Sequence, residues 1–68
     1  MNMKIIFKRD VDCDFYDHRL EEEWPKVFKR WQEVRASDVE ENGSLVNIAL
    51  SDGDSIMNVP RNAIDIVS

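Results

Sequence analysis

The chain has 68 residues, of which 34% are charged and 43% hydrophobic, with a net charge of −5. This length allows one domain with a small core, and the hydrophobic fraction is typical of a globular rather than a disordered chain. No apolar run approaches the ~20 residues that cross a bilayer, no signal peptide is evident, and the single Cys13 excludes an internal disulfide framework; we therefore expect a cytoplasmic protein with no membrane partner.

The N-terminal segment predicts β-structure. Residues 3–9 combine β-branched and aromatic residues, and the alternation continues through 10–15, where Val11, Cys13 and Phe15 share one face and aspartates the other. We expect one bent strand over 4–15. Two short strands that meet at a bulge near residues 9 and 10 are the alternative.

The next segment changes character. Residues 16–23 are rich in charge and predict a loop. Trp24, Phe28 and Trp31 then recur at helical spacing, and a proline at position 25 is tolerated in a first turn, so we expect a short helix over 24–30. An irregular loop whose aromatic side chains plug the end of a barrel is the alternative.

The C-terminal half predicts a β-meander. Asn-Gly and Asp-Gly pairs mark tight turns, because these residues tolerate positive φ. Val46, Ile48 and Leu50 alternate with residues 45, 47 and 49, and this uniformly aliphatic set is expected to face the core. The expected elements are strands over 31–39, 44–50, 56–59 and 64–67, with one 3₁₀ turn over 61–63.

This meander, with the Val59-Pro60 step before the 3₁₀ turn, resembles SH3-like small barrels, including Tudor-like modules. The resemblance covers about 38 residues and implies a mainly β fold with a minor α component. We expect one domain over 1–68, a partly open barrel of about five strands with a short helix or helical turn near 24–30. The ALYDY-like run of peptide-binding SH3 domains is absent, so polyproline binding is not implied.

The segment 10–21 places Asp10, Asp12, Asp14 and Glu21 at positions 1, 3, 5 and 12 of a calcium loop. Phe15 stands where that loop requires glycine, so we favour a solvated acidic strand face over a calcium site. The only histidine and the only cysteine lack paired-ligand spacing. We therefore predict no metal and no cofactor.

The aromatic residues of 16–31 are first interpreted as core, because two tryptophans supply much of the area that so small a chain can bury. An exposed protein-binding patch and a cage for methylated lysine are the alternatives. Basic residues lie beside this stripe and are interpreted as a solvated face. They are Arg19, Lys26, Lys29, Arg30 and Arg35.

No catalytic constellation is evident, so we predict a non-enzymatic protein–protein interaction module, of the kind found among acidic phage or mobile-element accessory and inhibitor proteins. Its partner would present a basic surface. The alternative is a small barrel that binds nucleic acid through 24–35, which the acidic composition disfavours; a homodimer stays open. The predicted partner-binding residues are Asp10, Asp12, Asp14, Asp17, Glu21, Glu22, Glu23, Trp24, Phe28 and Trp31.

Overall fold

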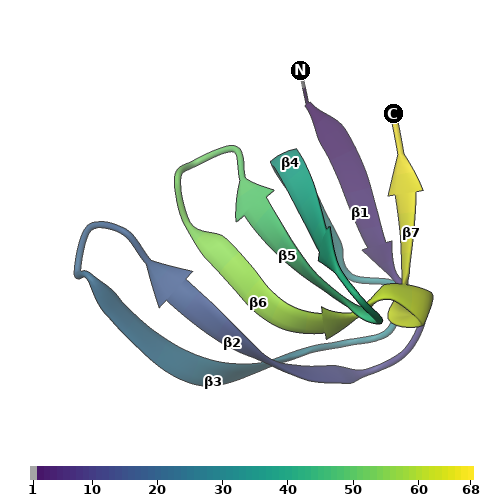
Figure 1. Ribbon diagram of the computed structural model, residues 1–68, viewed down its shortest axis with the longest axis horizontal. Helices are drawn as coiled ribbons and strands as arrows, with labels where there is room; N and C mark the ends of the chain where they lie inside the picture. Colours follow the sequence, from purple (N-terminus) through teal and green to yellow (C-terminus); the bar gives the residue numbers. More distant parts are fainter. Residues whose placement is uncertain (1) are drawn as a thin grey trace.

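The computed structural model describes residues 2–68 as seven β-strands and one 3₁₀ turn. All strands belong to one curled antiparallel sheet, with both termini at the same end (Figure 1). No helix in this part of the chain has the length and apolar character needed to span a membrane. The elements are β1 (Met3–Phe7), β2 (Val11–Asp17), β3 (Glu22–Phe28), β4 (Glu33–Asn42), β5 (Leu45–Leu50), β6 (Ser55–Pro60), η1 (Arg61–Ala63) and β7 (Ile64–Val67).

The strands lie in the order β3-β2-β6-β5-β4-β1-β7. The long strand β4 joins the two parts of the sheet, because its first half pairs with β1 and its second half with β5. Ala36 takes part in both pairings, and the register shifts between Ala36 and Asp38. Such a bulge increases local twist, which lets one strand serve both parts of a curled sheet.

The predicted bent strand over 4–15 is wrong. The alternative of two short strands is correct in number, but a connection between strands with different partners separates them instead of a bulge. β1 pairs with β4 and β7, whereas β2 pairs with β3 and β6. Asp10 lies in the connection, where its carboxylate accepts a hydrogen bond from the backbone N–H of Arg30 at 2.8 Å. The chain therefore turns away from β1 at this point instead of continuing along it.

The helix predicted over 24–30 is also wrong, as is the irregular loop offered in its place. β2 and β3 form a long hairpin that pairs Phe15 with Trp24 and Val11 with Phe28. On β3 the inward positions are Trp24, Lys26 and Phe28. The alternation is that of a strand, but the lysine interrupts its apolar pattern in the sequence. The predicted loop over 16–23 is shorter in the structure, where only the turn between the two strands is irregular. The sheet has seven strands rather than the expected five.

The meander prediction is confirmed in outline. β5, β6, η1 and β7 occur where expected, and the turns place Gly43 at φ 67° and Gly53 at φ 101°. β4 begins at Glu33 rather than at residue 31, so Trp31 lies outside the strand, and it continues to Asn42 rather than ending at residue 39, so the first turn is tighter.

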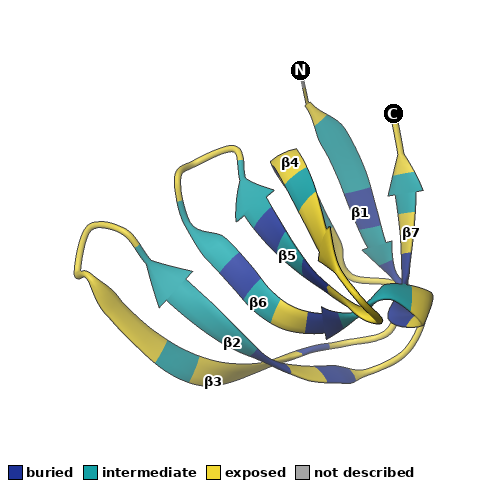
Figure 2. Cartoon of the chain, viewed as in Figure 1, coloured by how far each residue is buried: buried dark blue, intermediate teal, exposed yellow. Residues whose placement is uncertain are grey.

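Buried positions alternate with more exposed ones along several strands (Figure 2), so the core lies on one side of the sheet. Val46 and Ile48 are fully buried as predicted, whereas Leu50 is only partly buried. Phe7 and Phe28 stack inside the core with ring centroids 4.8 Å apart. The buried residues are Ile5, Phe7, Val11, Cys13, Phe28, Ala36, Val46, Ile48, Ile56, Val59, Ala63 and Ile64.

Candidate functional site

The side of the sheet that faces away from the core gathers carboxylates. Strand register places one row of outward positions across five strands, because neighbours in a ladder point to the same side. In this row Tyr16 of β2 pairs with Glu23 and Ser55, and Ala49 pairs with Ser55 and Asp38. The row therefore carries an acid at each end and small or aromatic residues between them.

A second outward row runs beside the first. Asp14 pairs with Pro25 on β3 and Met57 on β6, and Glu40 pairs with Asn47 on β5. Asp12, opposite Val27, extends the surface along β2 and β3. We call the carboxylates of these rows, with the residues between them, the acidic outer face. Its acids are Asp12, Asp14, Glu23, Asp38 and Glu40.

A shallow hollow of about 280 Å³ lies on the acidic outer face where β4, β5 and β6 meet. Asp38 and Glu40 stand on one side of the hollow, and Met57 and Ser55 on the other. Met57 and Tyr16 are both partly buried, which leaves part of each side chain accessible to a partner.

The carboxylates of the acidic outer face form no ion pair within residues 2–68. Asp14 accepts a hydrogen bond from Asn58 Nδ2 at 2.8 Å, which is a neutral donor. Acids elsewhere do meet cations: Glu33 contacts Lys4, and Glu41 contacts Arg61. Since no lysine or arginine occupies an outward position in the two rows, negative charge accumulates there.

The predicted acidic residues divide between this face and structural positions. Asp12, Asp14 and Glu23 lie on the acidic outer face. The Asp17 carboxylate accepts hydrogen bonds from the N–H groups of Arg19 and Leu20 and so holds the hairpin turn, where Glu21 adopts φ 53°. Asp10 contacts Lys29 at 3.8 Å as well as the Arg30 backbone, and Glu22 is exposed beside the turn.

The aromatic residues do not form one stripe. Phe28 is 2% exposed and belongs to the core. Trp24 is partly buried, with its ring 5.4 Å from that of Phe15. Trp31 is 60% exposed in the loop before β4, where the Arg30 guanidinium lies 4.7 Å from its ring.

The basic residues of this region are dispersed in the same way. Lys26 Nζ lies 4.7 Å from the Phe15 ring on the inner side of β3, and Lys29 contacts Asp10. Arg35 is exposed on β4, which pairs with β1 and β5 rather than β3. Segment 24–35 therefore presents Arg30 and Trp31 together rather than a continuous basic surface.

Cys13 is buried on the inner side of β2, and its thiol donates to the Lys26 carbonyl at 3.5 Å. Burial, and to a lesser extent the nearby charges of Asp14 and Asp12, raise the pKa of this thiol to about 11. The thiolate is the nucleophilic form of cysteine, so this environment disfavours nucleophilic chemistry at Cys13.

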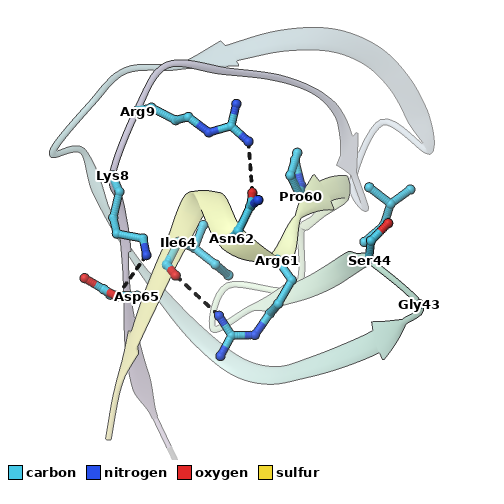
Figure 3. Close-up of a pocket in the computed structure, with 10 residues that line it drawn as sticks. Lys8, Arg9, Gly43, Ser44, Pro60, Arg61, Asn62, Ile64 and Asp65 are labelled. Carbon is cyan, nitrogen blue, oxygen red and sulfur yellow. Dashed lines mark hydrogen bonds and ion pairs between the residues drawn. The ribbon is translucent and has the colours of Figure 1, made fainter.

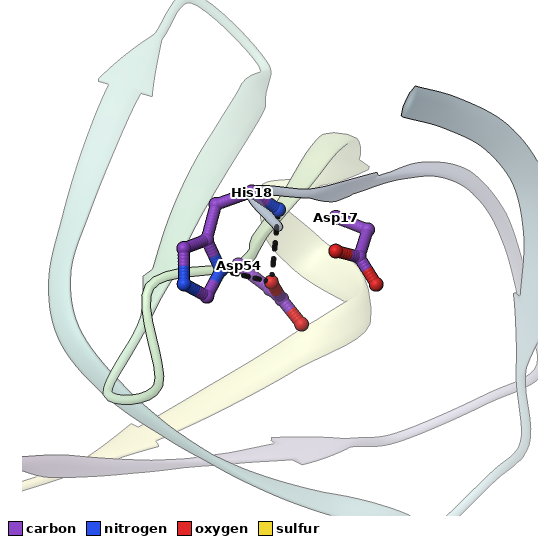
Figure 4. Close-up of side chains that lie close together, drawn as sticks. All are labelled: Asp17, His18 and Asp54. Atoms are coloured by element: carbon purple, nitrogen blue, oxygen red, sulfur yellow. Dashed lines mark hydrogen bonds and ion pairs between the residues drawn. The ribbon is translucent and has the colours of Figure 1, made fainter. Parts of the chain in front are cut away.

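A cluster of Asp17, His18 and Asp54 joins the β2–β3 turn to the β5–β6 turn (Figure 4). His18 Nδ1 lies 2.6 Å from Asp54 Oδ1, and the His18 backbone N–H donates to the same oxygen at 3.1 Å. These hydrogen bonds lower the pKa of the Asp54 carboxyl below its ordinary value. A carboxylate oxygen of Asp17 completes a set of ligand atoms within 4.8 Å of one another, a donor set able to hold a metal ion.

The calcium-loop acids, by contrast, are not brought together: Asp10 contacts the loop before β4, and Asp14 contacts Asn58 on β6. Sequence reasoning missed Asp38, Glu40 and Met57, whose place on the acidic outer face depends on pairing between distant strands. No protein-family model, curated protein or solved structure matches the chain.

Proposed function

We propose that the protein is a non-enzymatic protein-binding module that docks its acidic outer face on a lysine- and arginine-rich surface of a partner protein. The observation that carries this proposal is the set of unpaired carboxylates aligned on two outward rows, without a cation at any outward position of those rows. A basic partner supplies the missing counter-charges, and this complementarity speeds association and fixes orientation.

The composition of the face also suits a protein partner. Protein interfaces combine a less polar centre with a polar rim, and aromatic residues and methionine are enriched in them. Tyr16 and Met57 occupy central strands of the acidic outer face, whereas Glu23, Asp38 and Glu40 lie toward its margins. This arrangement fits an accessory or inhibitor protein that covers a basic surface of a larger factor, including one that otherwise holds nucleic acid.

We further propose that the scaffold is a partly open SH3-like barrel. Three features support this: η1 separates the last two strands, β1 pairs with both β4 and β7, and the bulged β4 is shared by both parts of the sheet. The strands β3 and β7 end the sheet order and stay unpaired with each other, which supports partial opening.

Affinity capture from the extract of the native host tests the function. Wild-type bait is compared with Asp12→Lys/Glu40→Lys on the acidic outer face and with Glu33→Lys/Asp65→Lys, which changes net charge equally elsewhere. We expect one partner retained by wild type and the control but lost by the first variant, with binding weakened by ~0.5 M salt. A partner captured equally by both variants would contradict the proposal.

A second candidate is binding of single-stranded nucleic acid by segment 24–35. It is supported by the exposed Trp31, which offers a stacking surface, and by the adjacent Arg30. Titration with a short oligonucleotide at low salt should then quench tryptophan fluorescence, and Trp31→Ala should abolish binding. Unchanged fluorescence, with no gel shift, would eliminate this candidate.

A further inference from the structure

A second hollow lies around η1 (Figure 3), and it shares no lining residue with the hollow on the acidic outer face. Its volume is about 530 Å³. The connection after β1, the β4–β5 turn, η1 and the start of β7 form its walls. We call it the η1 cavity.

The η1 cavity has the opposite charge to the molecule as a whole. Lys8, Arg9 and Arg61 line it, and Asp65 is the one carboxylate among its lining residues. Three cations and one anion give a local formal charge of +2, whereas the chain carries −5. Several cations in the lining of one concave site favour an anionic ligand.

Arg9 is the cation best placed to accept such a ligand. Its Nη2 donates to Asn62 Oδ1 at 3.0 Å, and no carboxylate of residues 2–68 lies within 4.0 Å of its guanidinium. A guanidinium has five N–H donors in a planar fork that matches phosphate oxygens. Most of these donors stay free for a ligand at Arg9.

The other two cations, Lys8 and Arg61, form ion pairs that a bound anion could replace. Lys8 Nζ lies 3.6 Å from Asp65, and Arg61 Nε lies 3.0 Å from Glu41. The two carboxylates are more than half exposed, at 57% and 64%. Exposed ion pairs contribute at most about 1 kcal/mol, so a bound anion can replace or share these contacts at small cost.

Backbone hydrogen bonds fix the walls of the cavity. The Arg61 N–H donates to the Ser44 carbonyl at 2.9 Å, and the Lys8 N–H donates to the Ala63 carbonyl at 2.8 Å. The β4–β5 turn and the connection after β1 are thus both tied to η1. The lining also offers neutral donors, the Ser44 hydroxyl and the Asn62 amide nitrogen.

We propose that the η1 cavity binds a phosphate-bearing ligand of nucleotide size. The cations recognise the phosphate oxygens, with Arg9 as the principal donor. The volume lies within the range of about 300–1,000 Å³ that small-molecule sites occupy. The proposal is independent of the protein-binding function, because the lining residues of the cavity and the carboxylates of the acidic outer face do not overlap.

Amide chemical shifts measured by NMR test the proposal, with ADP, pyrophosphate and adenosine titrated separately to about 10 mM at low salt. We expect ADP to shift the amides of residues 8–9, 43–44 and 61–62. If pyrophosphate binds as tightly as ADP, the phosphate contacts are supported, and the nucleoside contributes nothing to the affinity. Adenosine that binds as tightly as ADP, or absence of any shift with ADP, would overturn the proposal.

A matched pair of variants separates a specific site from general attraction of anions. Arg9→Gln should weaken ADP binding about tenfold or more, because it removes charge-assisted hydrogen bonds. Arg35→Gln makes the same charge change on β4 and should alter the affinity less than about twofold. Equal weakening by both variants would overturn the proposal. The amide spectrum of each variant shows whether it keeps the fold.

Discussion

Asn58 holds an unusual backbone position on β6. Its φ is 62°, a left-handed conformation that asparagine tolerates better than most residues. The register of β5 and β6 shifts here, so that Met57 and Asn58 together stand opposite Asn47. The Asn58 N–H donates to Asn47 Oδ1 at 3.2 Å, and its side-chain amide donates to Asp14. One residue therefore fixes a bulge and connects two strands of the acidic outer face.

Asn58→Ala should destabilise the fold by about 2 kcal/mol, because alanine loses the hydrogen bond to Asp14 and is strained at positive φ. Asn58→Gly loses the hydrogen bond but tolerates the backbone, so it should retain roughly 1 kcal/mol more stability than alanine. Urea unfolding measures both values. Equal losses in the two variants would show that backbone strain contributes nothing here.

The His18–Asp54 contact predicts a pH dependence of stability. The side-chain and backbone hydrogen bonds from His18 lower the folded-state pKa of Asp54 below its ordinary value of 3.8. The ionised form therefore stabilises the fold above the unfolded-state pKa, and this stabilisation disappears as the pH falls through the lower folded-state pKa.

The difference in melting temperature between wild type and Asp54→Asn should accordingly be fully present above about pH 5 and vanish as the pH falls to about 2. His18→Ala should reproduce part of this loss, because the backbone N–H of residue 18 can still donate to Asp54. A difference between wild type and Asp54→Asn that grows on acidification would contradict the assignment.

At the scale of elements, the β2–β3 hairpin shows where sequence reasoning failed. Trp24, Phe28 and Trp31 have helical spacing, yet the first two lie on alternate inward positions of a strand. Lys26 occupies the inward position between them and covers the Phe15 ring. A lysine whose ammonium group lies over aromatic rings looks polar in the sequence, so the alternation could not be recognised locally.

The C-terminal meander was predictable for the converse reason. Its turns are marked by Gly43 and Gly53, and Val46 and Ile48 alternate with less apolar residues. The acidic outer face was not predictable to the same extent. Asp38 reaches it only through pairing of β4 with β5 and then β6. Such pairing between distant segments leaves no local pattern.

Phe28 tests the role of β3 in the core. Its ring stacks on Phe7 with an interplanar angle of 11°, and it connects the end of the hairpin to β1. Phe28→Ala should cost about 3–5 kcal/mol in urea unfolding, a large share of the stability of so small a domain. Phe28→Leu should cost less than about 2 kcal/mol, since most of the volume is retained.

If the segment were instead a surface helix with Phe28 offered to a partner, both substitutions would change stability by less than about 0.5 kcal/mol. That outcome would overturn the strand assignment and the buried position of Phe28 together. A loss confined to the alanine variant supports both.

At the scale of the whole molecule, charge is separated in space. Five carboxylates that form no ion pair within residues 2–68 lie on the acidic outer face, whereas Lys8, Arg9 and Arg61 line the η1 cavity. Like charges held on one face repel one another and oppose folding. The acidic outer face is therefore expected to reduce the stability of the isolated protein, as surfaces specialised for binding commonly do.

Salt should then stabilise the protein. Raising sodium chloride from about 0.01 M to about 1 M shortens the Debye length from about 30 Å to about 3 Å and screens this repulsion. Relief of about 1 kcal/mol corresponds to a rise in melting temperature of roughly 4–8 °C for a domain of this size. Asp38→Asn/Glu40→Gln should melt higher than wild type at low salt and respond less to added salt.

The matched control is Glu33→Gln/Asp65→Asn, which removes two carboxylates that already contact Lys4 and Lys8. It changes the net charge by the same amount but leaves the repulsion among the carboxylates of the acidic outer face unchanged. Its melting temperature should therefore not exceed that of wild type at low salt. If both double variants behave alike, net charge alone determines how the melting temperature responds to salt. The acidic outer face would then hold no local charge repulsion that a basic partner could relieve.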